Sequence, residues 1–180
     1  MNNHKEFLPI NVAVVTISDT RTLENDKSGD VLEKRIKQAG HIVLAREIVQ
    51  DEFKKIFSLF SNLIKDKKID VIISTGGTGL TGRDITPEVM ETLFEKSIDG
   101  FGEMFRWMSY KKIGTSALQS RALAGVANGT YIFCLPGSPS ACRDGWDDIL
   151  VHQLDIRHKP CNFVEIMPRL QEHKYFRTKN

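Results

Sequence analysis

Cysteine is scarce in this chain of 180 residues, which contains only three. Cys134, Cys142 and Cys161 form no Cys-x-x-Cys pair and have no zinc-finger spacing. An odd number of widely spaced cysteines argues against a disulfide framework and against a structural zinc site. We therefore expect all three thiols to be reduced, with Cys134 as a small residue of the core.

The sequence also lacks any long hydrophobic run. A membrane-spanning helix needs roughly 18 or more consecutive apolar residues, and no stretch of the chain approaches that length. The first ten residues, MNNHKEFLPI, contain neither the basic segment nor the apolar stretch of a secretory signal. These absences predict a cytoplasmic protein that does not span a membrane.

An excess of one charge is likewise missing. The 25 Lys and Arg residues nearly balance the 23 Asp and Glu residues, which gives a formal net charge of +2. This balance argues against a nucleic-acid-binding protein held by bulk charge and against an acidic solvating tail. A content of 41% hydrophobic and 27% charged residues is ordinary for a globular chain, and the length favours one domain.

Short apolar runs alternate with segments of helical period along the chain. Strands are expected at residues 11–18, 41–49, 70–75, 121–127 and 130–135. Helices are expected at residues 29–39, 51–67, 86–96, 101–111 and 138–154. Asn128-Gly129 is a hairpin signal between the last two strands. This alternation predicts a single three-layer α/β/α domain with a mostly parallel sheet and one antiparallel hairpin strand.

The α/β domain is expected to span residues 11–158, after an N-terminal arm at 1–10 and before an extended C-terminal tail at 159–180. In parallel sheets, ligands bind beyond the carboxyl ends of the strands. Three loops leave those ends and are predicted to build the functional site: residues 18–28, 74–86 and 135–140.

The loop TGGTGLTGRD, residues 75–84, is the most informative stretch. It places four glycines within seven positions, with hydroxyl side chains between them. Glycines let backbone N–H groups approach an anion without obstruction by Cβ atoms. A flexible connection between a strand and a helix explains one or two glycines but not four, so the pattern favours phosphate binding.

Two better-known phosphate motifs match this loop only in outline. The pattern G-x-G-x-x-G at residues 77–82 resembles a dinucleotide fingerprint, but residues 83–85 separate its last glycine from the next helix. A P-loop requires Lys followed by Ser or Thr, and Arg83 and Asp84 stand at those positions. We therefore expect neither a nicotinamide or flavin site nor an NTPase P-loop.

Helix starts flank the glycine-rich loop. In Thr86-Pro87 and again in Ser138-Pro139, a hydroxyl residue is the expected N-cap and proline occupies the first helical position. Each helix N-terminus would offer unpaired N–H donors and a positive dipole end to an anion. One Ser-Pro pair is only a good helix start, whereas two starts beside a glycine-rich loop favour a two-sided polyanion pocket.

Two carboxylates accompany these anion-binding elements. Asp51 opens an expected helix and is either its N-cap or part of the site. Asp84 lies in the glycine-rich loop and is either a turn carboxylate paired with Arg83 or a site residue. Beside phosphates a carboxylate is repelled, unless Mg²⁺ lies between them.

Five motifs occur together in a specific order. TISDTR at 16–21, TGGTG at 75–79, RDITPE at 83–88, Ser120-Arg121 and LPGSP at 135–139 resemble the MoaB/MogA family of molybdopterin-binding proteins of molybdenum cofactor synthesis. The resemblance extends from about Val12 to Leu170, which is nearly the whole chain.

The resemblance implies a reaction and a set of residues. Catalytic members of the family transfer AMP from Mg·ATP to the terminal phosphate of molybdopterin and release pyrophosphate. By resemblance, the two catalytic residues are Asp51 and Asp84, which are also the implied Mg²⁺ ligands. The implied substrate-binding residues are Ser18, Asp19, Thr75, Gly76, Gly77, Thr78, Gly79, Ser120, Arg121, Pro136, Gly137 and Ser138. Two alternatives stay open: a molybdopterin-binding protein without adenylyl transfer, and a structural scaffold.

The resemblance also implies a homo-oligomer, either a trimer or a hexamer of two trimers. The segment 101–111 gives separate support, because Phe101, Phe105 and Met108 share one helical face. Met104 and Trp107 lie toward another face, which would serve as a contact surface. Burial of the whole helix between the sheet and a neighbouring helix is the alternative.

Overall fold

The computed structural model describes residues 5–176. Its centre is a six-stranded sheet in the order β2-β1-β3-β6-β5-β4. The strands are β1 (Asn11–Ile17), β2 (Ile42–Val49), β3 (Val71–Thr75), β4 (Lys96–Ser97), β5 (Leu123–Ala127) and β6 (Thr130–Leu135). Only β5 runs antiparallel to its neighbours, β6 and β4. The predicted α/β fold with a mostly parallel sheet and an antiparallel hairpin strand is confirmed.

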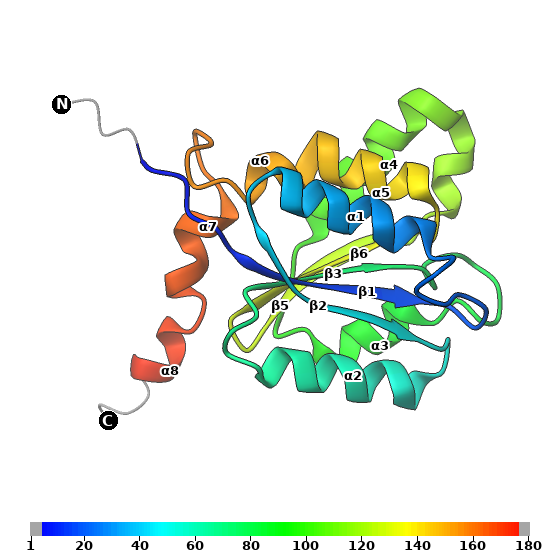
Figure 1. Cartoon of the computed structure of the whole chain (residues 1–180), viewed down its shortest axis with the longest axis horizontal. Coiled ribbons are helices and arrows are strands. Elements are labelled where there is room, and N and C mark those ends of the chain that lie inside the picture. The colour runs from blue at the N-terminus through cyan, green and yellow to red at the C-terminus, as the bar shows by residue number, and fades with distance from the viewer. Residues whose placement is uncertain (1–4, 177–180) are drawn as a thin grey trace.

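Helices cover both faces of this sheet, which makes three layers (Figure 1). One face carries α1 (Lys27–Gln38), α4 (Asp99–Ile113), α5 (Pro139–Gly145) and α6 (Val151–Gln153), with a π-helical turn at Trp146–Leu150 joining the last two. The other face carries α2 (Phe53–Lys65) and α3 (Thr86–Leu93). In the described chain no helix is both long and apolar enough to cross a membrane.

The apolar residues form two cores, one on each side of the sheet. Along β1, Val12 and Val14 belong to the core under α1 and α5, whereas Ala13 and Val15 belong to the core over α2. This alternation follows from the two-residue period of a strand that is covered on both faces. Cys134 is fully buried, as predicted, and the three cysteines are free thiols.

The predicted N-cap Thr86 is wrong, and so is the alternative in which Asp51 is an N-cap. Helix α2 begins after Glu52 rather than after Asp51, and no side chain caps it. Ile85 occupies the N-cap position of α3 without a side-chain capping bond, and Thr86 lies within the first turn, where its hydroxyl donates to the carbonyl of Gly76 at 2.9 Å. Ser138 is the N-cap of α5 as predicted, and its oxygen accepts from the N–H of Ala141 at 3.1 Å.

The segment predicted as the end of a helix up to Lys96 contains strand β4 instead. Helix α3 ends at Leu93, and the N–H of Glu95 donates to the carbonyl of Val126 at 2.8 Å. Gly125 makes room for this pairing, because a Cβ there would lie 2.4 Å from the ring of Phe94. Packing of Phe94 on the hairpin thus overrides the helical propensity of the segment.

The C-terminal tail is not extended as predicted. It forms α7 (Phe163–Ile166), a 3-10 turn (Met167–Arg169) and α8 (Glu172–Phe176). Val164 is buried in the core, and the hydroxyl of Tyr131 donates to the carbonyl of Phe163 at 3.1 Å. The segment with α7 therefore packs on the core, and Figure 1 shows it beside the amino end of the sheet.

Candidate functional site

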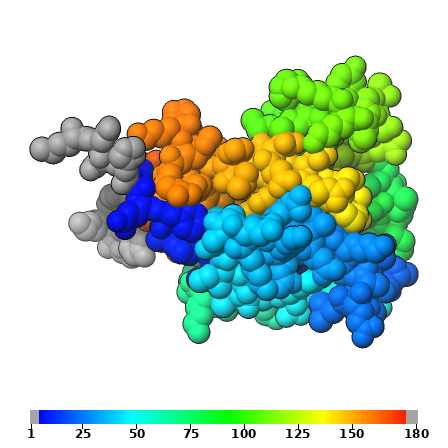
Figure 2. All heavy atoms as spheres, turned by 45° about the horizontal axis from the view of Figure 1, so that its top comes forward, coloured from blue at the N-terminus to red at the C-terminus, as the bar shows by residue number. Residues whose placement is uncertain are grey.

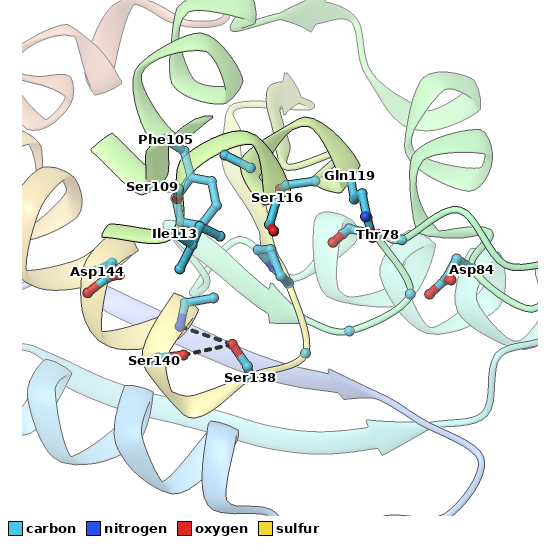
Figure 3. A pocket seen from close by; sticks show the side chains of 18 of the residues that line it. Thr78, Asp84, Phe105, Ser109, Ile113, Ser116, Gln119, Ser138, Ser140 and Asp144 are labelled. Carbon is cyan, nitrogen blue, oxygen red and sulfur yellow. Dashed lines mark hydrogen bonds between the residues drawn. The ribbon is translucent and has the colours of Figure 1, made fainter. Parts of the chain in front are cut away.

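A cavity of about 740 Å³ lies at the carboxyl ends of β1, β3 and β6, where the three predicted loops meet. Figure 3 shows its two ends: Asp84 and Thr78 stand on the glycine-loop side, and Asp144 and Ser140 stand on the other. We call the first the glycine-loop end and the second the α4–α5 end, after the helices that line it.

Most of the predicted site residues line this cavity. They are Ser18, Asp51, Gly76, Gly77, Thr78, Gly79, Asp84, Ser120, Pro136, Gly137 and Ser138. Three predicted residues do not line it: Asp19, Thr75 and Arg121. Each of these three bonds to the loops that build the cavity.

The glycine-rich loop can reach its position only because two residues lack side chains. Gly76 has φ +107°, and a Cβ there would lie 2.1 Å from the carbonyl oxygen of Ile17. Gly77 has φ +64°, and its Cβ would lie 2.3 Å from the hydroxyl of Thr86 and 3.0 Å from Asp51 Oδ1. The loop therefore passes very close to the end of β1 and to Asp51, which explains the adjacent glycines.

Hydrogen bonds join the glycine-rich loop after β3 to the loop after β6. The hydroxyl of Thr75 donates to the carbonyl of Pro136 at 2.9 Å, and the N–H of Gly76 donates to the carbonyl of Leu135 at 3.0 Å. Thr75 is fully buried and accepts from the thiol of Cys142 at 3.2 Å. Burial in low dielectric raises the pKa of that thiol to about 11, so Cys142 is protonated and acts as a donor.

Arg121 holds the glycine-rich loop from the other side. Its Nε donates to the carbonyl of Gly79 at 2.7 Å, its Nη2 donates to the carbonyl of Asp84 at 2.7 Å, and its Nη1 pairs with Glu88. The backbone N–H of Arg121 also donates to the carbonyl of Thr78 at 3.0 Å. All three guanidinium nitrogens thus bond to the protein, which makes Arg121 a brace of the loop.

Asp84 is held as a carboxylate by the loop itself. Its Oδ2 accepts from the N–H of Thr81 at 2.8 Å and from the Thr81 hydroxyl at 2.7 Å. Partial burial acts to raise the pKa of Asp84, but hydrogen bonds from Thr81 and from the backbone of Gly79 outweigh it and leave the pKa below its ordinary value. The alternative in which Asp84 pairs with Arg83 is wrong, because Arg83 bonds to a different aspartate.

Asp51 lies across from the glycine-rich loop and is half-buried. Burial raises its pKa, and the negative charges of Asp19 and Asp84 raise it further, although Arg83 acts in the opposite direction. Three carboxylates therefore lie near one another: Asp51 and Asp84 in the cavity lining, and Asp19 just outside it. Such crowding disfavours ionisation of Asp51 and would be relieved by a bound cation.

The partner of Arg83 is Asp19. Arg83 Nε donates to Asp19 Oδ2 at 3.0 Å, and Arg83 Nη2 donates to both carboxylate oxygens at 2.8 and 2.7 Å. Asp19 Oδ1 also accepts from the N–H of Asp51 at 3.2 Å. The pair therefore connects the loop after β1, the start of α2 and the glycine-rich loop, and the hydrogen bonds from Arg83 lower the pKa of Asp19.

Most of the lining residues that sequence reasoning missed come from α4, from the 3-10 turn at Gly114–Gln119 and from α5. They are Phe105, Ser109, Lys112, Ile113, Ser116, Ala117, Gln119, Ser140, Ala141, Arg143 and Asp144. Lys112 pairs with Asp144 at 2.7 Å and with Asp148 at 3.0 Å, which links α4 to α5. The segment after α4, Gly114–Gln119, forms a 3-10 turn that lines the cavity, and Figure 3 shows its Ser116 and Gln119 there. Its sequence carries no motif that marks it as part of a site.

The glycine-loop end can hold a divalent cation only if a bound substrate supplies some of the coordinating oxygens. The described part of the chain has no group of three or more His, Cys, Asp or Glu that could hold a metal ion. Mg²⁺ is usually bound in proteins by one or two carboxylates, substrate phosphates and waters. The donor set of Asp51 and Asp84, beside a glycine-rich loop, fits that pattern.

Fold and cavity together define an α/β protein with a cavity lined by a glycine-rich loop at the carboxyl edge of its sheet. Residues 13–156 match the family described as a probable molybdopterin binding domain. The chain belongs to this family of molybdenum cofactor biosynthesis, and the resemblance inferred from its motifs is confirmed.

Similar proteins cover most of the chain. The molybdenum cofactor biosynthesis protein B of Escherichia coli K12 is 47% identical over 88% of this chain and 93% of that protein. A probable molybdopterin adenylyltransferase of Methanocaldococcus jannaschii is 37% identical over 78% of this chain and 87% of that protein. A crystal structure of molybdenum cofactor biosynthesis protein B covers 93% of this chain and 99% of its own, with 37% identity and a TM-score of 0.84.

Proposed function

We propose that the protein binds molybdopterin and Mg·ATP in this cavity and transfers AMP to the terminal phosphate of molybdopterin, with release of pyrophosphate. The observation that carries the proposal is the composition of the glycine-loop end, where Asp51 and Asp84 lie beside a glycine-rich loop of the kind that binds phosphate. The adenylyltransferase name of the Methanocaldococcus jannaschii relative supports the same reaction.

The reaction exchanges one phosphorus–oxygen bond for another. An oxygen of the molybdopterin phosphate attacks the α-phosphorus of ATP, and the bond from that phosphorus to the bridging oxygen breaks. The electron pair leaves with pyrophosphate. The attacking oxygen is ionised near neutral pH, since the second pKa of a phosphate monoester is about 6, so the protein need not supply a strong general base.

The protein's contribution is to position anions and offset their charge. Gly77 and Gly79 line one side of the cavity, and Ser138, at the N-terminus of α5, lines another. Asp51 and Asp84 are the proposed holders of Mg²⁺, which would neutralise phosphate charge when bound. Arg121 and Thr75 act indirectly, because they fix the loops that carry these groups.

The test is product identification with purified protein, molybdopterin, ATP and Mg²⁺. Mass spectrometry should detect adenylylated molybdopterin, and omission of any one component should abolish it. If no product forms while molybdopterin still binds, the chain is a molybdopterin-binding protein without adenylyl transfer, and the proposed reaction is rejected.

We also propose that the chain forms a homo-oligomer through the outer face of α4. Phe101 and Phe105 are buried as predicted, whereas Met104, Trp107 and Tyr110 have exposed fractions of 51%, 60% and 59%. Figure 2 shows α4 and the turn after it, in green, standing out from the body of the molecule. Sedimentation equilibrium at micromolar concentration should give a trimer or hexamer of the 20.4 kDa chain, and a monomer would reject the proposal.

A further inference from the structure

Arg83 has N–H donors that its pairing with Asp19 does not use. Its Nε and Nη2 make all of its hydrogen bonds to described residues, and Nη1 makes none. A guanidinium carries five N–H donors in a rigid plane, so the two on Nη1 are available to a ligand without breaking the pair. Arg83 itself lines the cavity.

The pairing also fixes where this guanidinium stands. Asp19 Oδ1 accepts from the N–H of Asp51 at 3.2 Å, which anchors the carboxylate to the start of α2. Arg83, although 61% exposed, is therefore held by a fixed partner from a separate loop. A bidentate Arg–carboxylate contact has a defined geometry, unlike a lone surface cation.

The other cations that line the cavity come from different elements. Lys112 comes from α4 and is engaged by Asp144 and Asp148, and Arg143 comes from α5. At the glycine-loop end, Asp51 and Asp84 add negative charge that would repel a triphosphate. Arg83 is the lining cation that the glycine-rich loop itself contributes to offset that charge.

We propose that Arg83 binds the β- and γ-phosphates of ATP through Nη1 and stays in contact with the departing pyrophosphate, and that Asp19 positions it for this contact. This inference rests on the proposed function. As the bond between the α-phosphorus and the bridging oxygen breaks, the electron pair moves onto pyrophosphate. A prepositioned guanidinium stabilises that growing charge more than it stabilises bound ATP.

The first experiment measures binding of ATP and of inorganic pyrophosphate by calorimetry. Arg83→Gln should weaken both by about 10- to 100-fold, the range for loss of a charge-assisted contact, and leave molybdopterin binding within about twofold. Arg83→Lys should not restore affinity, because an ammonium cannot hold Asp19 and phosphate in one plane. Arg21→Gln is the matched control: Arg21 is an exposed arginine of the loop after β1, which also carries Asp19, but it does not line the cavity, and its loss should change neither affinity.

A double-variant cycle separates positioning from general charge. Asp19→Asn should weaken pyrophosphate binding about fivefold in the wild-type background and have almost no effect in the Arg83→Gln background. Independent, additive effects of the two substitutions would contradict positioning by Asp19. Equal losses from Arg21→Gln and Arg83→Gln would reduce the effect to bulk charge and would overturn the inference.

These binding readouts keep the inference distinct from the proposed reaction. If no AMP is transferred but pyrophosphate affinity still depends on Arg83, the proposed function fails and the phosphate site stands. If AMP is transferred and Arg83→Gln changes neither ATP nor pyrophosphate affinity, the assignment of Arg83 is wrong while the reaction remains.

Discussion

The glycine-loop end of the cavity is built from backbone held by hydrogen bonds, whereas the α4–α5 end is built from side chains on two helices and a 3-10 turn. At the first end, Arg121, Thr75 and Thr86 each bond to loop carbonyls. At the second, Lys112 joins α4 to α5 through two aspartates. Under the proposed function, the glycine-loop end performs the phosphate chemistry and the α4–α5 end accommodates the rest of the ligand.

The largest expected effect comes from the carboxylate held by the glycine-rich loop. Asp84→Ala should lower turnover on the order of 100-fold or more, because it removes a proposed cation ligand at the reacting phosphates. Molybdopterin affinity should change by only a few-fold. Activity that survives within a few-fold would make Asp84 a turn residue and would remove the chemistry from this end.

The backbone geometry of the same end can be tested through stability. Gly76→Ala should lower the free energy of unfolding by at least about 2 kcal/mol, since alanine is strained at positive φ and its Cβ would meet the Ile17 carbonyl. Gly82→Ala, in the same loop, has nothing within 4 Å of its Cβ and should change stability by no more than about 0.5 kcal/mol. Urea unfolding measures both, and equal losses would contradict the close approach at Gly76.

The brace provided by Arg121 should affect turnover more than binding. Arg121→Lys cannot bridge Gly79, Asp84 and Glu88 together, so kcat should fall about 10-fold as the loop loosens. Arg35→Lys is the control, because it breaks a bidentate pair with Asp147 away from the cavity and should leave kcat unchanged. A parallel loss of molybdopterin affinity would instead indicate that Arg121 contacts the substrate.

A smaller effect is expected at the α4–α5 end. Ile113 lines the cavity and is 57% exposed, so Ile113→Ala should raise the KM for molybdopterin about three- to fivefold through lost apolar contact, with kcat unchanged. Ile166→Ala removes an isoleucine of similar exposure on α7, outside the cavity, and should have no kinetic effect. A fall in kcat at Ile113 would contradict the division between the two ends.

The smallest effect concerns a residue remote from both ends. Burial lowers the pKa of His41 below its ordinary 6.5, against the opposing charge of Asp155, and its Nδ1 accepts from the N–H of Ile10 at 3.3 Å. The unfolded chain therefore binds this proton first, so stability falls as pH drops below about 6.5, by at most about 1.4 kcal/mol per pH unit. His41→Gln should flatten that slope in urea unfolding between pH 7 and 5.5, and an unchanged slope would show that His41 does not titrate there.

The ends of the strands could be predicted because the local sequence pattern agrees with the position of each strand in the fold. Val71–Thr75 is apolar and followed at once by glycines, so it predicts a buried strand and a loop at its carboxyl end. Ser138-Pro139 likewise predicts a helix start that the structure confirms. Positive φ at Gly76 and Gly77 is the physical reason for a pattern that is visible in the sequence alone.

What sequence reasoning missed depends on contacts between distant elements. No local sequence pattern indicates that Arg83 bonds to Asp19 rather than to Asp84, because Arg83 and Asp19 are 64 residues apart. Thr86 was predicted as a cap because Thr-Pro is typical of one, yet its hydroxyl bonds to Gly76. The helical tail after residue 158 was missed because its short helices are stabilised by packing rather than by propensity.

The most direct test of the central claim is the stoichiometry of pyrophosphate release. With saturating Mg·ATP, addition of molybdopterin to the wild-type protein should release one pyrophosphate for each molybdopterin consumed, and the Asp84→Ala protein should bind molybdopterin but release pyrophosphate on the order of 100-fold more slowly. Release that does not depend on molybdopterin, or no release by a wild-type protein that binds both ligands, would contradict adenylyl transfer at the glycine-loop end.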